Sequence, residues 1–167
     1  ASWDELATAP DACDMLVDQL GLDIEASVIR QSLEEGYAFD LEAERAGFKF
    51  WKPLVWDKRT IGMGYHYRAR YEFILFFEKG KRRLNDLGVS DVISVPRIHG
   101  GYPAEKPVGV SEVLIGQSSQ PGDAVADPFM GSGSVGVAAA RLGRRFLGND
   151  LNPEAVRFAA HRLREFG

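Results

Sequence analysis

The sequence has few of the residues that stabilise small secreted proteins or span membranes. Cys13 is the single cysteine among 167 residues, which excludes an internal disulfide and favours a reducing compartment, the cytoplasm. The longest apolar run, Phe73 to Phe77, is far shorter than the roughly 20 residues that a membrane-spanning helix needs. No signal peptide is visible. The three histidines and the cysteine do not form a metal-ligand pattern.

The composition is that of an ordinary globular domain, but its charges are unevenly distributed. Hydrophobic residues make up 45% and charged residues 26%, which excludes wholesale disorder. The net charge of −4 combines a segment 1–44 with 12 acidic and one basic residue and a segment 45–83 with 11 basic and three acidic residues. This contrast indicates a polyanionic partner for the basic segment. The alternative is a solvated basic face balanced by the acidic segment.

Hydrophobic periodicity and glycine or proline punctuation predict an α/β chain. Residues 1–35 have an acidic, helical pattern. Trp51 and Trp56 are interpreted as core residues. Strands are expected over 48–56, 71–77, 123–127 and 145–150, and helices over 108–118, 134–142 and 153–166, with a loop over 58–70 and irregular structure over 79–107. The last four of these elements alternate as strand, helix, strand and helix, which is the unit of a parallel sheet.

A glycine-rich loop follows the expected strand 123–127. Gly131, Gly133 and Gly136 form G-x-G-x-x-G, and Asp150 lies 19 residues beyond Gly131, at the end of the next strand. Glycine permits a tight turn and a close approach of a ligand to the backbone, and the acid can accept hydrogen bonds from ribose hydroxyls. The pattern therefore predicts a nucleotide-like cofactor site; the alternative is a purely structural turn.

Two cofactors fit this loop, a dinucleotide and S-adenosylmethionine (SAM). Only 17 residues follow Asp150, whereas a dinucleotide-binding domain normally opens with the loop and adds further strands after it. Asp127, at the end of the strand before the loop, would repel a pyrophosphate but could bind a cationic amino group. Both observations favour SAM.

Several stretches resemble the motifs of bacterial and phage DNA amino-methyltransferases, which modify adenine N6 or cytosine N4. Asp127 to Ser134 and Arg144 to Asp150 resemble the SAM-binding motif pair of this family, and the permuted, beta-type members place the loop near the C-terminus, as here. Tyr102, Ala104 and Glu105 depart from the His, Thr and Gln that are more common in the family. The other matching stretches, in the order that the family has them, are Gly47 with Phe48, Leu54 to Lys58, Tyr67 with Arg68, Glu72 to Phe76, and Lys106 with Pro107.

The resemblance implies a Rossmann-like SAM-methyltransferase sheet, mostly parallel with one antiparallel strand, in a circularly permuted motif order. The expected domain covers 36–167 and follows an acidic helical segment, 1–35, of uncertain role. Within the domain the resemblance implies DNA-side strands over 36–83, a short linker or recognition remnant over 84–107 and a SAM-binding unit over 108–167.

The resemblance also implies roles for single residues. Asp127 and Phe129 would contact the methionine end and the adenosine region of SAM, and Asp150 would hold the ribose hydroxyls. Gly131 and Gly133 would admit the cofactor to the backbone, and Lys106 would lie near its carboxylate. On the DNA side, the implied residues for the flipped target base and nearby phosphates are Tyr65, Tyr67 and Arg68. For the two tyrosines, packing within the loop is the alternative.

The implied function is site-specific methylation of double-stranded DNA within a restriction-modification system, with adenine N6 favoured over cytosine N4. However, the catalytic Pro-Pro motif of the family is absent from the 167 residues, so the sheet is expected to be incomplete and the catalytic residues are unknown. We favour the omission of residues that the full protein has. The alternatives are half of a split enzyme completed by a homodimer or a complementing chain, a SAM- or DNA-binding relative without catalysis, and, remotely, a permuted NAD-dependent oxidoreductase.

Overall fold

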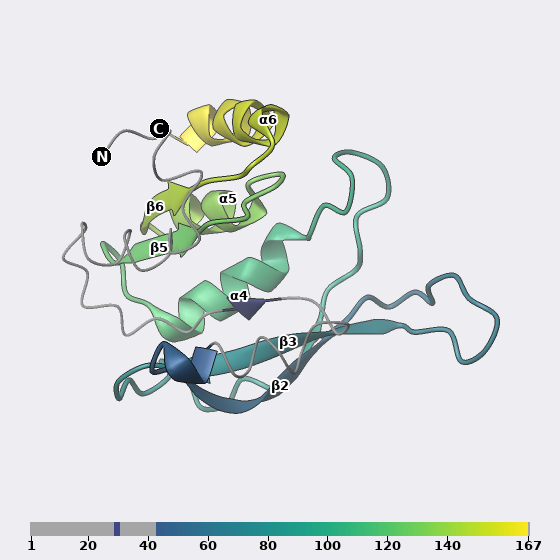
Figure 1. Cartoon of the computed structure of the whole chain (residues 1–167), viewed down its shortest axis with the longest axis horizontal. Helices are drawn as coiled ribbons and strands as arrows, with labels where there is room; N and C mark the ends of the chain where they lie inside the picture. The colour runs from purple at the N-terminus through teal and green to yellow at the C-terminus, as the bar shows by residue number, and fades with distance from the viewer. Residues whose placement is uncertain (1–28, 31–42, 167) are drawn as a thin grey trace. The chain divides into compact units, whose positions relative to one another are not determined.

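The computed structural model describes residues 29–30 and 43–166, which fall into two compact units. Residues 29–30 and 43–120 form the hairpin unit, and residues 121–166 form the glycine-loop unit (Figure 1). Most of the expected acidic helical segment, 1–35, lies outside the described residues. Its described part, Ile29–Arg30, is strand β1 instead of helix, because it pairs with the edge of a longer strand at Leu75 and Phe76.

The hairpin unit is built on a four-stranded sheet in the order β1-β3-β2-β4. Strands β2 (Lys49–Asp57) and β3 (Tyr71–Glu78), both expected from the sequence, are antiparallel neighbours, and β4 (Val92–Ser94) runs parallel to β2. Strand β3 is antiparallel to both β1 and β2, so within this sheet it is the one strand that runs against the others. The expected irregular segment 79–107 therefore contains a strand, β4, that was not predicted.

The two tryptophans of β2 have opposite environments. Trp56 is buried, and its indole N–H donates to the carbonyl oxygen of Val95 over 2.7 Å. Trp51 is 55% exposed, so its interpretation as a core residue is wrong. The register of β2 against β3 shifts between Phe50 and Lys52. Trp51 is the extra residue of this bulge, and a bulge re-aims the side chain that it carries.

Helix α4 (Val108–Ser118) covers one face of the sheet, as Figure 1 shows. The core of the unit consists of Trp56, Ile74, Ile93 and Val110, with Leu54, Val95, Val113 and Leu114 packed against it. Because Trp56 and Ile93 are partners across β2 and β4, the short strand β4 is held by one buried side chain as well as by its ladder. This core fixes the edge at which β2 ends and β3 begins.

The glycine-loop unit follows the order that the sequence predicted. Strand β5 (Ala124–Asp127) is followed by helix α5 (Ser134–Arg141), strand β6 (Arg145–Gly148) and helix α6 (Pro153–Leu163), with a 3₁₀ turn over Arg164–Phe166. Strands β5 and β6 are parallel, with Asp127 opposite Gly148. Helix α6 starts at an asparagine cap, since the Asn152 side chain accepts from the Glu154 N–H over 2.9 Å.

Two glycines of the loop are required by packing inside this unit. Gly133 has a φ of +74°, and a Cβ there would lie 2.8 Å from the Cβ of Ala159 in α6. A Cβ on Gly136 would lie 2.6 Å from the ring of Phe146. Both separations are too short for real atoms, so the glycines let α5 approach α6 and β6.

Among the described residues, no helix is long and apolar enough to cross a membrane.

The substitution Gly133→Ala should destabilise the chain by roughly 2–4 kcal/mol, because it combines left-handed backbone strain with overpacking against Ala159. The matched control is Gly116→Ala in α4, where a new Cβ meets nothing within 4 Å and should stabilise the helix by about 0.5–1 kcal/mol. Urea denaturation of both variants checks the difference. Equal midpoints for the two variants would contradict the packing role of Gly133.

Candidate functional site

The loop after β5 is tied to the end of β6 by hydrogen bonds that involve both predicted acids. The Phe129 N–H donates to Asp127 Oδ1 over 3.0 Å, which turns the chain sharply after the strand. The Gly131 N–H donates to Asp150 Oδ2 over 2.9 Å. In addition, the Met130 N–H donates to the carbonyl oxygen of Asn149 over 2.9 Å. The structure thus brings Asp127, Phe129, Gly131, Gly133 and Asp150 together around one loop, and their contacts with a cofactor stay a prediction.

The electrostatics of this site favour a cation. Burial raises the pKa of Asp127 above its usual value, the negative charge of Asp150 raises it further, and the hydrogen bond from the Phe129 N–H opposes both effects. Two carboxyl groups that repel each other in this way gain free energy when a positive group lies beside them. The site therefore suits a ligand that has a cationic part.

The loop also leaves atoms available to a ligand. Phe129 is 68% exposed, whereas its neighbour Met130 is buried. Asp150 Oδ1 accepts from the Asn152 N–H over 2.9 Å and Oδ2 accepts from Gly131. Each carboxylate oxygen has two lone pairs, so Asp150 can accept further bonds from hydroxyl groups. In the described part of the chain, no cluster of His, Cys, Asp and Glu side chains could hold a metal ion.

Lys106 belongs to the hairpin unit, where it pairs with a carboxylate that the sequence analysis had not singled out. Its Nζ lies 2.8 Å from Glu72 Oε2 and 5.5 Å from the ring centroid of Trp56. Lys58 Nζ lies 3.2 Å from the other oxygen of Glu72. Partial burial raises the pKa of Glu72, but the bonds from Lys106 and Lys58 outweigh it and leave the pKa below its usual value. The Glu72 carboxylate thus binds two ammonium groups. A contact between Lys106 and a cofactor stays a prediction.

Tyr65, Tyr67 and Arg68 lie on the loop 58–70, which extends from the end of the β2–β3 hairpin (Figure 1). Both tyrosine side chains are fully exposed in their unit, so packing within the loop does not account for them. The Nε of Arg68 donates to the carbonyl oxygen of Gly62 over 2.6 Å. Arg68 therefore supports the loop whether or not its guanidinium also binds a phosphate.

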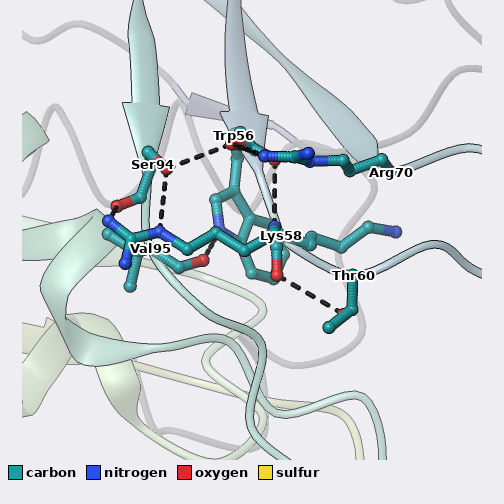
Figure 2. Close-up of polar contacts among 8 residues, drawn as sticks. Trp56, Lys58, Thr60, Arg70, Ser94 and Val95 are labelled. Carbon is teal, nitrogen blue, oxygen red and sulfur yellow. Dashed lines mark hydrogen bonds and ion pairs between the residues drawn. The ribbon is translucent and has the colours of Figure 1, made fainter.

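A second cluster that was not predicted from the sequence surrounds Asp57, the last residue of β2. Figure 2 shows two of its members, Arg70 and Ser94. Arg70 donates Nε to Oδ1 over 2.7 Å and Nη2 to Oδ2 over 2.9 Å. Ser94 Oγ donates to Oδ2 over 3.0 Å, and the Arg59 N–H donates to Oδ1 over 2.9 Å. The bond from Arg70 is the main cause of a pKa for Asp57 that is far below its usual value, and the bonds from Arg59 and Ser94 add to it. This carboxylate joins the ends of β2, β3 and β4.

A sequence signal for both clusters exists in the charge pattern. The basic segment 45–83 contains three acids, Asp57, Glu72 and Glu78. Each of them is a hydrogen-bond acceptor in the structure, Asp57 for Arg70, Glu72 for Lys58 and Lys106, and Glu78 for the indole of Trp51. Isolated acids in a basic segment therefore indicate the positions where side-chain hydrogen bonds hold neighbouring strands together.

The parallel strand–glycine loop–helix unit defines a class of α/β protein, and comparison with known proteins narrows it. Residues 85–161 match the family described as DNA methylase, of the N6/N4 type. The chain is 32% identical over 157 residues to the type II methyltransferase M2.DpnII of Streptococcus pneumoniae, a match that covers 81% of this chain and 59% of that protein. It is 40% identical over 62 residues to the DNA adenine methyltransferase YhdJ of Escherichia coli (strain K12), covering 37% of this chain and 21% of that protein.

Solved structures agree with this assignment. The crystal structure of the M1.HpyAVI–SAM complex superposes with a TM-score of 0.72 and 25% identity, over 85% of this chain and 77% of that chain. These matches support an amino-methyltransferase of the N6/N4 class, and the chain has the Rossmann-like fold of the solved structures. It spans 59% of the pneumococcal protein. The similarities give no support to the oxidoreductase alternative.

Replacement of Asp57 by Asn should lower the stability of the chain at neutral pH, because Arg70 loses its ion-pair partner. The folded pKa of Asp57 is depressed below the usual 3.8, so its contribution is complete above that pH and is lost as the pH falls toward the folded pKa. Urea midpoints of wild type and Asp57→Asn should therefore differ at pH 7, and the difference should be smaller at about pH 2, nearer the folded pKa. Glu44→Gln is the control, and a gap that is the same at both pH values would contradict the ion pair.

Proposed function

We propose that the chain binds SAM and directs the transfer of its methyl group to an exocyclic amine of a base in double-stranded DNA. The single observation that carries this proposal is the loop in which Asp150 accepts the Gly131 N–H while Asp127 lies partly buried beside this second acid. Such a loop suits a ligand with ribose hydroxyls and a cationic amine, and SAM has both. The family match over residues 85–161 supports the same conclusion.

The residues of the loop would bind and orient the cofactor. When bound, SAM supplies an electrophilic methyl group on a sulfonium sulfur. Asp150 would accept bonds from the ribose hydroxyls, Asp127 would pair with the amino group, and the exposed ring of Phe129 would lie against the adenosine. Gly131 would admit the cofactor to the backbone, and Lys106 would lie near its carboxylate. Gly133 has a packing role in addition to any ligand contact.

The DNA side of the proposal rests on the hairpin unit. Tyr65 and Tyr67 would hold the flipped target base by stacking, and Arg68 would contact a neighbouring phosphate. Adenine N6 is the favoured target, and the similarity to YhdJ, a protein named as a DNA adenine methyltransferase, supports this choice. The permuted motif order and the domain 36–167 remain part of the same proposal. DNA as the substrate is consistent with a cytoplasmic enzyme of a restriction-modification system.

A second candidate function is supported by the missing Pro-Pro motif. A chain without this motif could bind SAM and DNA yet transfer no methyl group, or could need a complementing chain or a homodimer to complete the catalytic site. The positions before residue 36, where the permuted order would place the motif, lie outside the described residues apart from Ile29 and Arg30. The two candidates differ in methyl transfer and agree in cofactor binding, so they can be separated.

Cofactor binding is tested by isothermal titration calorimetry with SAM. Asp150→Ala removes an acceptor that carries a negative charge, and hydrogen bonds to charged groups are worth roughly 1.5–3 kcal/mol each. We expect affinity to fall about 10- to 100-fold, whereas Glu154→Ala on the exposed start of α6 leaves it unchanged. Absence of heat with the wild-type chain would refute SAM binding.

Methyl transfer is tested by incubating the chain with methyl-labelled SAM and unmethylated bacterial DNA. We expect label in the DNA, recovered after hydrolysis as N6-methyladenine in preference to N4-methylcytosine. SAM binding without incorporation, for the complete gene product as well, would reject the enzyme and leave the non-catalytic candidate. Recovery of N4-methylcytosine would correct the target base alone.

A further inference from the structure

The loop 58–70 exposes a regular series of large apolar side chains. They occupy every second position from 61 to 67, alternating with two glycines and a histidine. We call this series the apolar ridge, and its exposed fractions are 55% for Ile61, 97% for Met63, 103% for Tyr65 and 107% for Tyr67. Apolar surface of this extent is unfavourable in water and marks a surface that a partner covers.

The root of the loop is fastened, so the ridge is presented by a supported projection. The Lys58 N–H donates to the carbonyl oxygen of Arg70 over 2.9 Å, and the Gly62 N–H donates to that of Ala69 over 2.8 Å. Arg68 spans the same root through its bond to the Gly62 carbonyl. Below this root, the Asp57–Arg70 ion pair closes the ends of β2 and β3. Ile61 lies beside these bonds, and Met63, Tyr65 and Tyr67 lie beyond them on the projecting part of the loop.

The charges around the ridge select the partner. The ridge is flanked by Arg59, Arg68 and Arg70, in a segment with 11 basic and three acidic residues. Lys58 and Arg70 pair with acids of this segment and Lys52 pairs with Asp91. The segment still carries many more basic than acidic residues, and this net positive charge favours an external polyanion. A second copy of the chain would bring the same basic surface against itself, which is unfavourable. Duplex DNA has both an anionic exterior and an apolar base stack.

We propose that Ile61 and Met63 form a wedge that enters the base stack of duplex DNA beside the target base. This inference rests on the proposed function and goes beyond it, since it assigns the start of the ridge to the duplex and Tyr65 and Tyr67 to the extruded base. Isoleucine and methionine are side chains that proteins insert between base steps. Removing a base from the stack leaves a gap, and an unbranched thioether adapts its shape to such a gap.

The wedge is tested with two fluorescein-labelled duplex pools of randomised sequence, one intact and one with an internal abasic site. The gap already exists in the abasic pool, so insertion costs less there. By fluorescence anisotropy, the full wild-type chain should bind the abasic pool about 10-fold more tightly than the intact pool. Ile61→Ala/Met63→Ala should lose this preference and keep the dependence of affinity on salt. Arg68→Ala should keep the preference and reduce the salt slope by about one phosphate contact.

The matched control is Leu87→Ala/Val89→Ala, which removes two exposed apolar side chains of the same unit outside the loop and should bind both pools as wild type does. An equal preference in Ile61→Ala/Met63→Ala and wild type would overturn the wedge. The wedge would also be overturned if sedimentation showed a concentration-dependent dimer that this variant abolishes without any change in DNA binding. The ridge would then be a contact with a second copy of the chain. If the wild-type chain gave no heat on titration with SAM but still preferred the abasic pool, the proposed cofactor would be refuted and the wedge would be retained.

Discussion

The carboxylate of Asp57 is the constraint on which the open edge of the hairpin unit depends. It accepts four hydrogen bonds from three residues, Arg70, Ser94 and Arg59, and these residues stand at or just beyond the ends of three strands. Without this acceptor the guanidinium groups of a strongly basic segment would repel one another at the sheet edge. The Asp57 carboxylate thus lets basic side chains gather at the sheet edge while the ends of β2, β3 and β4 stay joined.

In the glycine-loop unit the fixed groups are acids, whereas the hairpin unit gathers basic groups. Asp150 is fixed by the Gly131 and Asn152 N–H groups, so its oxygens are oriented before any ligand arrives. Asp127 lies partly buried nearby, and the desolvation that raises its pKa is a cost that a cation would relieve. The basic hairpin unit therefore suits an anion, whereas the acidic loop suits a cationic ligand. A methyltransferase of the N6/N4 class has to bind both a cationic ligand, its sulfonium cofactor, and an anionic one, the nucleic acid.

The sequence predicted the elements whose signals are local and missed those that depend on pairing. Alanine-rich periodicity and the glycines at 131, 133 and 143 delimit α5 directly, and the loop acids follow from the strand ends. Strand β4 could not be predicted, because three residues with one buried side chain carry no periodicity. The bulge at Trp51 and the partners of Asp57 and Glu72 arise from contacts between distant segments, so only the completed sheet defines them. The expected contact of Lys106 with a cofactor still rests on resemblance.

The contrast between the two tryptophans of β2 has an optical consequence. Trp56 is shielded from water in the core of the hairpin unit, whereas Trp51 is solvated and bonded to a carboxylate. Residues 121–166 contain no tryptophan. In a Trp3→Phe variant, which removes the third tryptophan of the chain, emission excited selectively in the indole band will therefore carry one blue-shifted and one red-shifted component from the hairpin unit and nothing from the glycine-loop unit. Such emission offers a way to follow the hairpin unit separately from the glycine-loop unit in a single sample.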